Sequence, residues 1–348
     1  MRHECFRGLL YGVVIQNGHT YNEVAYNEIK NVEKKGISGG SIGHGYSDIH
    51  NNLVYWTGGY TDQIDHGIVI GGHDHKIYNN IVWTDTDTGG YAVKFDGESG
   101  GADCYGGQIY NNLILRWGIG IGVMDCQGST LIANNTIYNQ NAGSIGSTSA
   151  SGKHGIAVSV GGGGATPNTI VRNNIIYYPA IGASYAHMLY LNGSCTNTTI
   201  TNNLFYHSGN NERFRVGGTS ALTMSYMENT WSGSGGNLFQ NNIIANPSFS
   251  GGVHTVSNLP YAGFNINGYP VRSGLSILAN SVAVSSGYNM SAYFNKDILG
   301  VSRPQGSAWD IGAYEYGGTT PTPTTGLCHL LTSSNSTPQG YGAHPTMY

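Results

Sequence analysis

The stretch HGIVIGGHDHKIYNNIVW, residues 66–83, contains both of the segments whose repetition decides the fold. Its second half places two asparagines between short runs in which apolar residues alternate with polar ones. Alternation with a period of two indicates β-strand. The same form recurs in SDIHNNLVY (47–55), GQIYNNLIL (107–115), TLIANNTIY (130–138), NTIVRNNIIY (168–177), TTITNNLFY (198–206) and NLFQNNIIA (237–245), with a weaker copy, YNEVAYNEIK (21–30).

The second asparagine of each pair marks the repeat, and it falls at residues 52, 80, 112, 135, 174, 203 and 242. The spacings are 28, 32, 23, 39, 29 and 39 residues, so a constant element is joined by loops of variable length. Asparagine tolerates the left-handed backbone conformation at turns. Stacked asparagine side chains can also form hydrogen-bonded ladders along a coil axis. We therefore assign the pairs a structural role.

The first half of the opening stretch, HGIVIGG, belongs to a second strand class that lies between the asparagine pairs. Its other copies read KGISGGS, YAVKFDG, IGIGVMD, HGIAVSV, HMLYLNG and RFRVGG. Two short strands per repeat, with equivalent strands paired in parallel, predict an all-β solenoid.

The composition argues against two classes of binding partner, nucleic acid and membrane. The 348 residues include 54 glycines and 25 tyrosines, and 15 Lys plus Arg against 19 Asp plus Glu give a net charge of −4. A nucleic-acid surface needs a basic stripe, and the short cluster Lys30, Lys34 and Lys35 does not supply one. No apolar run reaches the ~18 residues of a membrane span, so we expect neither nucleic acid nor membrane as a partner.

Five cysteines are present, and none forms a CxxC pair. Cys104 and Cys126 lie 22 residues apart, about one repeat, and are the one plausible bridge. Two buried free thiols are equally compatible with this spacing.

Taken together, the asparagine-turn strands and the HGIVIGG-type strands over residues 20–250 resemble the right-handed parallel β-helix superfamily of pectate-lyase-like proteins. RPQGSAWDIGAYEY (303–316) resembles the closing motif of secreted bacterial members. The resemblance implies a β-helix domain over residues 1–316, a Pro/Thr-rich linker over 317–325 and a tail over 326–348. It also implies a secreted, monomeric protein that acts on a polysaccharide, although the N-terminus shows no secretory signal.

Aligning the second strand class on its first core residue predicts which side chains share a face. The aligned positions are Ile37, Ile68, Val93, Ile121, Ile156, Leu189 and Phe214. The outward column one residue later reads Ser38, Val69, Lys94, Gly122, Ala157, Tyr190 and Arg215, and the next outward column contains Asp96 and Asn192. The column two residues before the aligned position reads Lys35, His66, Tyr91, Ile119, His154, His187 and Glu212. The HG pair before a strand is compatible with turn chemistry alone.

Charge is concentrated between Asp62 and Asp103, which favours a site there. GGYAVKFDG resembles the lysine-bearing strand of β-helix pectate lyases, where a lysine removes the proton next to a uronate carboxylate that Ca²⁺ neutralises. The resemblance assigns Lys94 as the base, with His66 and Asp96 beside it. His66 and Val69 stand where that family has further calcium-binding aspartates, and pairing of Lys94 with Asp96 would oppose the base role.

Four carboxylates on neighbouring loops suit a hard cation such as Ca²⁺, although solvated turn aspartates fit equally well. These candidate ligands are Asp62, Asp65, Asp85 and Asp87. For substrate binding the columns offer Tyr91, Tyr190, Arg215, Asn192, His154 and His187.

Two other function classes remain open. A glycoside hydrolase would use two carboxylates, Asp96 with Asp65, Asp87 or Asp125, to cleave a glycosidic bond. A non-catalytic glycan-binding or adhesive solenoid would use tyrosines and tryptophans, such as Tyr91, Tyr190, Tyr60 and Trp56, as stacking faces. We rank β-elimination from a uronic-acid polymer slightly above hydrolysis.

Overall fold

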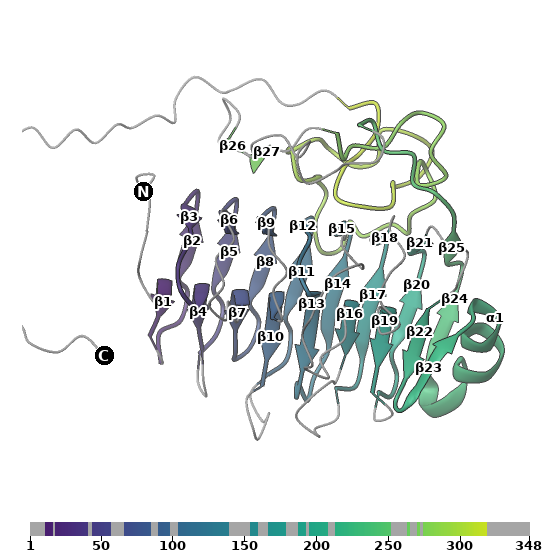
Figure 1. The fold of residues 1–348 in the computed structure, drawn as a ribbon, viewed down its shortest axis with the longest axis horizontal. Helices are drawn as coiled ribbons and strands as arrows, with labels where there is room; N and C mark the ends of the chain where they lie inside the picture. Colours follow the sequence, from purple (N-terminus) through teal and green to yellow (C-terminus); the bar gives the residue numbers. More distant parts are fainter. Residues whose placement is uncertain are drawn as a thin grey trace, which may run out of the picture.

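The structure is a computed structural model. It describes residues 11–16, 18–40, 44–56, 66–84, 90–97, 104–138, 154–158, 166–178, 187–192, 195–207, 213–251, 263–264, 270–271 and 274–318. Three long sheets wind around one axis, and equivalent strands of successive coils lie side by side (Figure 1). Equivalent strands of successive coils pair in parallel, so the predicted all-β parallel β-helix is confirmed.

Each coil contributes one strand to each sheet, and the last coil adds a second strand to the first sheet, paired antiparallel with its neighbour. Sheet I consists of β1 (Tyr11–Ile15), β4 (Lys35–Gly39), β7 (His66–Ile70), β10 (Tyr91–Asp96), β13 (Ile119–Met124), β16 (His154–Val158), β19 (His187–Leu191), β22 (Phe214–Val216) and β23 (Thr219–Leu222). Sheet II consists of β2 (Glu23–Ala25), β5 (Asp48–His50), β8 (Lys76–Tyr78), β11 (Gln108–Tyr110), β14 (Thr130–Ala133), β17 (Thr169–Arg172), β20 (Thr199–Thr201) and β24 (Leu238–Gln240). Sheet III consists of β3 (Glu28–Lys30), β6 (Leu53–Trp56), β9 (Ile81–Thr84), β12 (Leu113–Leu115), β15 (Thr136–Tyr138), β18 (Ile175–Tyr178), β21 (Leu204–His207) and β25 (Ile243–Ile244).

The expectation of two strands per repeat was wrong, because each asparagine-pair segment forms two strands on different sheets. The first asparagine of the pair has a positive φ, for example 55° at Asn79 and 53° at Asn111. This left-handed residue bends the chain at the middle of the segment, so that the residues before it join sheet II and those after it join sheet III.

The second asparagines form the predicted ladder inside the coils. Each side-chain amide donates to the side-chain oxygen of the next asparagine at 2.9–3.0 Å. That oxygen also accepts the backbone N–H of the preceding asparagine, as Asn112 does from Asn80. The ladder therefore satisfies buried polar groups that a turn inside a core would otherwise leave unpaired. Its members are Asn27, Asn52, Asn80, Asn112, Asn135, Asn174, Asn203 and Asn242.

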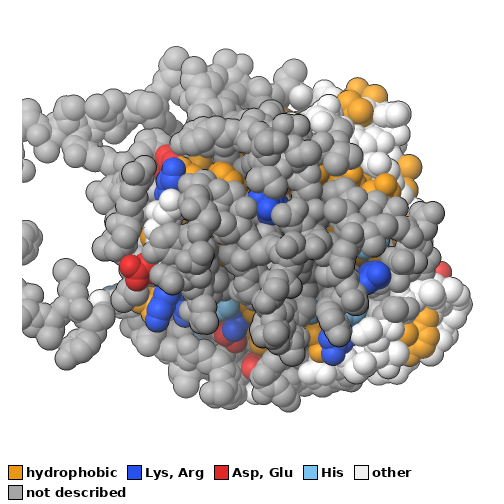
Figure 2. Space-filling view, in the orientation of Figure 1, with side chains coloured by type: hydrophobic (Ala, Val, Ile, Leu, Met, Phe, Trp, Pro, Cys, Tyr) orange, Lys and Arg blue, Asp and Glu red, His pale blue; other side chains and the backbone are white. Residues whose placement is uncertain are grey.

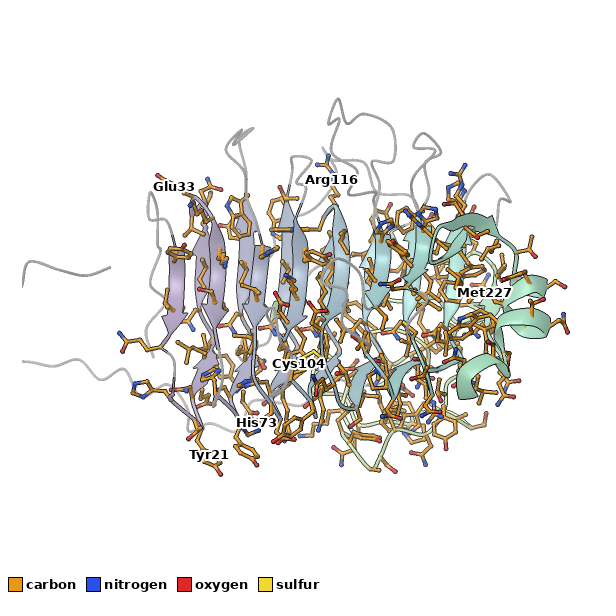
Figure 3. All side chains as sticks on the ribbon, turned by 90° about the horizontal axis from the view of Figure 1, so that it is seen from below. Tyr21, Glu33, His73, Cys104, Arg116 and Met227 are labelled. Carbon is orange, nitrogen blue, oxygen red and sulfur yellow. A yellow bond between two sulfur atoms is a disulfide. The ribbon has the colours of Figure 1, made fainter. Side chains whose placement is uncertain are left out.

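A short helical segment closes the C-terminal end of the coils. It consists of α1 (Met224–Tyr226), η1 (Met227–Trp231) and η2 (Ser234–Gly236), and Thr223 caps its N-terminus. Met227 and Trp231 are buried against the last coil of the core. Figure 3 shows Met227 at this end of the molecule. Among the described residues, no helix has the length and apolar character needed to cross a bilayer.

The chain then returns along the outside of sheet III, where residues 274–318 lie across several coils (Figure 1). A short hairpin of β26 (Gly263–Phe264) and β27 (Pro270–Val271) precedes them. The first asparagines of the pairs hold this covering segment. Asn111 donates to the Lys296 carbonyl at 2.7 Å, and Asn173 donates to the Tyr288 carbonyl at 2.8 Å. The two asparagines of each pair thus have different roles.

The RPQGSAWDIGAYEY motif organises this covering segment around a buried arginine. The Arg303 guanidinium pairs with Glu315 at 3.0 Å, and both side chains are fully inaccessible. It also donates to the carbonyls of Asp310 and Gly312. Burial raises the pKa of the Glu315 carboxyl, and the Arg303 charge opposes that shift. The motif therefore has a structural role, that of holding the cover of sheet III together.

Candidate functional site

The columns predicted for sheet I are confirmed by the strand register. Lys94 pairs with Val69 on one side and with Gly122 on the other, and Tyr190 pairs with Arg215. In the earlier column, His66 lies beside Tyr91, and His154 beside His187. The last member of that column, Glu212, lies outside the described residues.

The glycine of the HG pair has a steric reason. A Cβ added to Gly67, which follows His66, would collide with the Val82 side chain of sheet III, and one added to the equivalent Gly36, which follows Lys35, would collide with Val54. The interior between the two sheets is therefore too narrow for a side chain at these positions. The histidine before the glycine faces outward, so the two residues of the pair need separate explanations.

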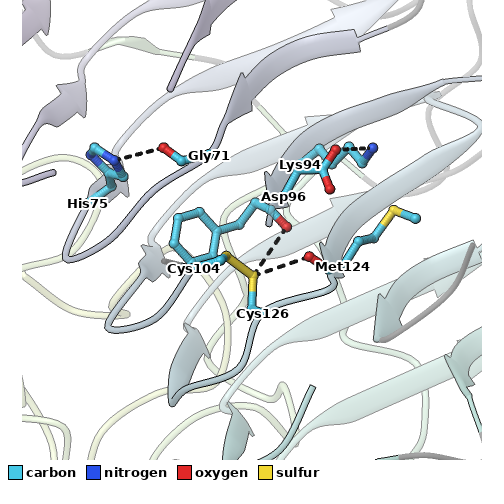
Figure 4. Close-up of a disulfide and its surroundings, with 8 residues drawn as sticks. Gly71, His75, Lys94, Asp96, Cys104, Met124 and Cys126 are labelled. Atoms are coloured by element: carbon cyan, nitrogen blue, oxygen red, sulfur yellow. Dashed lines mark hydrogen bonds and ion pairs between the residues drawn. A yellow bond between two sulfur atoms is a disulfide. The ribbon is translucent and has the colours of Figure 1, made fainter. Parts of the chain in front are cut away.

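Four polar side chains gather on β7 and β10, and we call them the Lys94 cluster: His66, Tyr91, Lys94 and Asp96. The Lys94 ammonium pairs with the Asp96 carboxylate at 2.5 Å, with 14% and 18% of the two side chains exposed (Figure 4). The same ammonium lies 5.4 Å from the centre of the Tyr91 ring, and the His66 ring lies 5.5 Å from that ring. The three residues assigned to catalysis are therefore neighbours.

The protonation states within the Lys94 cluster follow from burial and from neighbouring charges. Burial, with Lys94 and Lys35 as weaker causes, lowers the pKa of His66 to about 3. The neutral imidazole accepts the backbone N–H of Tyr91 at Nδ1, 3.2 Å away. Burial and then the Asp96 charge raise the pKa of Tyr91 to about 12. At neutral pH the cluster thus presents a neutral imidazole and a protonated phenol next to an ion pair.

A second group, the Arg215 cluster, consists of His154, His187, Tyr190 and Arg215 on β16, β19 and β22. The Arg215 guanidinium lies 4.2 Å from the centre of the Tyr190 ring, and His154 packs against the same ring at 4.8 Å. The two imidazoles approach each other, with 3.3 Å between their Nδ1 atoms. Both are only 2% exposed. Tyr190 and Arg215 are the partly exposed members of this cluster.

Small residues separate the two clusters. Gly122 and Ala157 occupy the column between Lys94 and Tyr190. Since neighbouring strands lie about 4.8 Å apart, Lys94 and Tyr190 are roughly 14 Å apart and cannot act on one bond. The Tyr91 ring leans over Gly122, where a Cβ would collide with it. Asn192, the remaining candidate for binding, follows β19 and is partly exposed.

The four candidate calcium ligands, Asp62, Asp65, Asp85 and Asp87, lie outside the described residues. Within the described ranges, no three side chains of His, Cys, Asp or Glu lie close enough together to hold a metal ion. Asp96 is already paired with Lys94. The described residues alone do not form a calcium site, and we derive no chemical step from one.

Two further sequence hypotheses concern Trp56 and Asp125. Trp56 is fully buried, and its indole N–H donates to the Val32 carbonyl, so its proposed role as a stacking face for sugars was wrong. Tyr60, proposed with it, lies outside the described residues. Asp125 directly follows Met124, the residue paired with Asp96, and is nearly buried. It is the one suggested hydrolase partner of Asp96 that the structure describes.

A disulfide between Cys104 and Cys126 lies beside the Lys94 cluster (Figure 4). Cys126 follows β13 by two residues and contacts the carbonyl of Phe95, which lies between Lys94 and Asp96. The bridge therefore ties two consecutive coils together near the strand that carries the candidate base. Cys195 is a buried free thiol, and burial raises its pKa to about 12.

On the face drawn in Figure 2, the described lysine and arginine side chains form separate patches among other residues. Comparison with known proteins adds no assignment to this geometry. No family model matches the chain, and no curated protein matches it by sequence.

Proposed function

We propose that this protein is an extracellular enzyme that binds an acidic polysaccharide along the outward face of sheet I and cleaves it by β-elimination. The observation that carries the proposal is the pairing of a cation with a tyrosine at two places on sheet I. Lys94 lies over Tyr91, and Arg215 over Tyr190. Cations bind uronate carboxylates, and tyrosine rings pack against sugar rings.

The spacing of the two pairs suits a polymer. Lys94 and Arg215 are four strands apart, about 19 Å, so the two cations would contact different sugar units of one chain. Gly122, over which the Tyr91 ring leans, and Ala157 add no large side chain of their own to the column between the two cations. The Cys104–Cys126 bridge supports an extracellular location, because disulfides form and persist in oxidising compartments.

Cleavage would follow the chemistry of uronate elimination. A base removes the proton next to the uronate carboxylate, the electron pair of that C–H bond forms the C4–C5 double bond, and the C4–O bond breaks. The leaving oxygen keeps the electrons of the C4–O bond and takes up a proton. Lys94 is the proposed base and must first lose the proton that pairs it with Asp96. Tyr91 has a phenol that stays protonated at neutral pH and lies beside Lys94, so it can supply the proton.

Absorbance of the unsaturated product tests this proposal. The protein would be incubated with pectic, alginate and glycosaminoglycan polymers, first with Ca²⁺ and then with a chelator. We expect a rise for at least one polymer, reduced 10²- to 10⁴-fold in rate by Lys94→Ala. Lys76→Ala, a partly buried lysine on sheet II, is the matched control and should keep the wild-type rate. Full elimination activity in Lys94→Ala would remove the lyase assignment.

A non-catalytic glycan-binding protein is the second candidate, and the short Lys94–Asp96 ion pair favours it. A lysine held by a carboxylate is a good ligand for a uronate and a poor base. Retention of acidic polymers without any product, reduced by Arg215→Ala and by Lys94→Ala alike, would establish this function. Release of reducing ends without an unsaturated product would instead indicate hydrolysis with Asp96 and Asp125.

A further inference from the structure

In the described part of the chain, three stacked aromatic ladders run along the coils, and two of them are covered by another segment. Tyr78 and Tyr110 stack on sheet II, and Phe294 of the covering segment stacks on Tyr110 at 4.3 Å. On sheet III, Phe249 packs against the ladder of Tyr138, Tyr177 and Tyr206, 5.2 Å from the Tyr177 ring. In this protein, a ring ladder is a surface on which another group docks.

The third ladder lies on the turns between sheet I and sheet II, and we call it the aromatic strip: Tyr21, Tyr46, His73 and Tyr105. Neighbouring rings are 5.0 Å apart, parallel at both ends and perpendicular in the middle. Figure 3 shows Tyr21 and His73 on the same edge of the molecule, pointing away from the ribbon. The four rings occupy successive coils, so the strip is about 15 Å long.

The strip is exposed, unlike the other two ladders. Tyr21, Tyr46 and Tyr105 are 76%, 46% and 41% exposed. Such fractions leave ring surface as well as hydroxyl edges accessible. Within the described part of the chain, no ring from a distant segment stacks on it. Ring stacking alone would stabilise the coils, yet three exposed tyrosines in one row go beyond what that role requires.

The charges of the aromatic strip favour an uncharged ligand over an anionic one. None of its four ring residues carries a fixed positive charge, and the Asp74 carboxylate lies at its centre. Asp74 is 3.0 Å from the Nδ1 atom of His73, and its negative charge is the main cause that raises the pKa of Tyr46. A polyuronate would be repelled by this carboxylate, whereas neutral sugars offer hydroxyls to it and apolar ring faces to the tyrosines.

From these contacts we infer that the aromatic strip is a second carbohydrate-binding surface, which takes a neutral glycan segment. It runs parallel to sheet I, and His73 follows the end of β7 by three residues. Chain length places His73 within about 14 Å of Val69, the neighbour of Lys94. The substrate class is thus a polymer with both uronic-acid and neutral portions. The inference that the polymer has an acidic portion rests on the proposed function, whereas the assignment of the neutral site does not.

Affinity electrophoresis in gels that contain a soluble neutral galactan, arabinan, mannan or β-glucan tests the inference. The background is Lys94→Ala, so that the polymer is not cut. We expect at least one polymer to retard the protein and the double variant Tyr21→Ala/Tyr105→Ala to bind it about tenfold more weakly. Tyr21→Phe/Tyr105→Phe should stay within about threefold of the starting affinity. Tyr226→Ala, which removes an exposed tyrosine on α1, should leave the retardation unchanged.

Tyr21 and Tyr105 are chosen because each has one ring neighbour within the strip, so their loss disturbs the ladder least. If the double variant fails to fold, Tyr105→Gln alone gives the same comparison. Retardation of the alanine variant equal to that of Lys94→Ala would overturn the inference, as would the absence of retardation by every neutral polymer. Elimination of acidic oligomers is measured separately in variants that carry the Tyr21 and Tyr105 substitutions but keep Lys94. Failure of the proposed function and failure of the neutral binding site therefore give different results.

Discussion

The outer faces of sheet III and sheet I differ in how strictly the repeat is kept. On sheet III, one column reads Tyr55, Trp83, Leu115, Tyr138, Tyr177 and Tyr206, and these residues are apolar or aromatic from coil to coil. On sheet I, the column through Lys94 changes character at almost every coil. A face that keeps one residue class needs the same packing at each step, whereas an irregular polar face is not required by coil stacking. The comparison supports the proposal that the functional surface lies on sheet I.

The largest expected effect comes from breaking the cover of sheet III. Arg303→Met leaves the buried Glu315 carboxylate without its cation, and we expect a loss of about 3–5 kcal/mol in the free energy of unfolding. Denaturant unfolding measures it. Lys296→Met changes an exposed lysine of the same segment and should alter stability by about 0.5 kcal/mol or less. Equal effects of the two substitutions would mean that the buried pair does not hold the cover.

The asparagine ladder gives the next largest effect. Asn112→Ala removes the acceptor for the backbone and side-chain N–H groups of Asn80. The Asn80 backbone N–H is then left without its acceptor, and the carbonyls of Ile77 and Tyr110 lose a donor, so stability should fall by about 3 kcal/mol. Asn241→Ala is the control, because Asn241 is exposed and the substitution adds only left-handed strain of about 1 kcal/mol. A cost at Asn112 no greater than that at Asn241 would remove the ladder as a main source of stability.

Acid should destabilise the turn beside sheet I. His75 is fully buried, accepts the Ser47 N–H at Nδ1 and contacts the Gly71 carbonyl through Nε2. Burial, and then His44, lowers its pKa to about 4 from an unfolded value near 6.5. Between these values the unfolded chain binds more protons, so stability falls as the pH decreases from about 6.5 to about 4.

Thermal unfolding across this pH range measures the effect, which is at most about 3 kcal/mol for one histidine. His75→Gln should flatten the profile, although His66, His44 and His207 also have lowered pKa values and will retain part of the slope. An unchanged slope in His75→Gln would show that the loss of stability arises elsewhere.

The smallest effect on stability is expected on sheet I itself. In Lys94→Met/Asp96→Asn both members of a partly exposed ion pair are neutral, so stability should change by less than about 1 kcal/mol. Binding of an acidic polymer should nevertheless fall, because one of the two cations is gone. Electrophoretic retardation by polygalacturonate, compared with that of Lys76→Ala, measures it. A large loss of stability with unchanged retardation would contradict this assignment, because the ion pair would then stabilise the fold and not bind the polymer.

The fold was largely predictable, because the repeated asparagine pairs and the apolar alternation specify the same packing in each coil. The register of sheet I and the Asn ladder followed from these repeats. The number of strands per coil did not follow, because the left-handed turn at the first asparagine interrupts a segment whose alternation continues on both sides. Docking of the covering segment on Asn111 and Asn173 depends on contacts between residues more than 100 positions apart, which no local pattern records.

The candidate site was predictable only in part. The columns identified Lys94, Asp96, Tyr91 and His66 as neighbours, yet the register alone did not reveal the burial of His154 and His187. The aromatic strip was missed, although a signal exists. Its four rings precede the second asparagine of their coils by six or seven residues, at positions that a search for polar or charged groups passes over.

The asparagine ladder also gives the stack a polarity. In every bond between two ladder asparagines, the side-chain amide of the N-terminal residue donates to the side-chain oxygen of the C-terminal one. The ladder is therefore a head-to-tail chain of chemically identical links. A whole coil that brings its own asparagine could be inserted or deleted between two links without reversing any other bond. Whole coils are then the units by which the outward face of sheet I can be changed without redesign of the core.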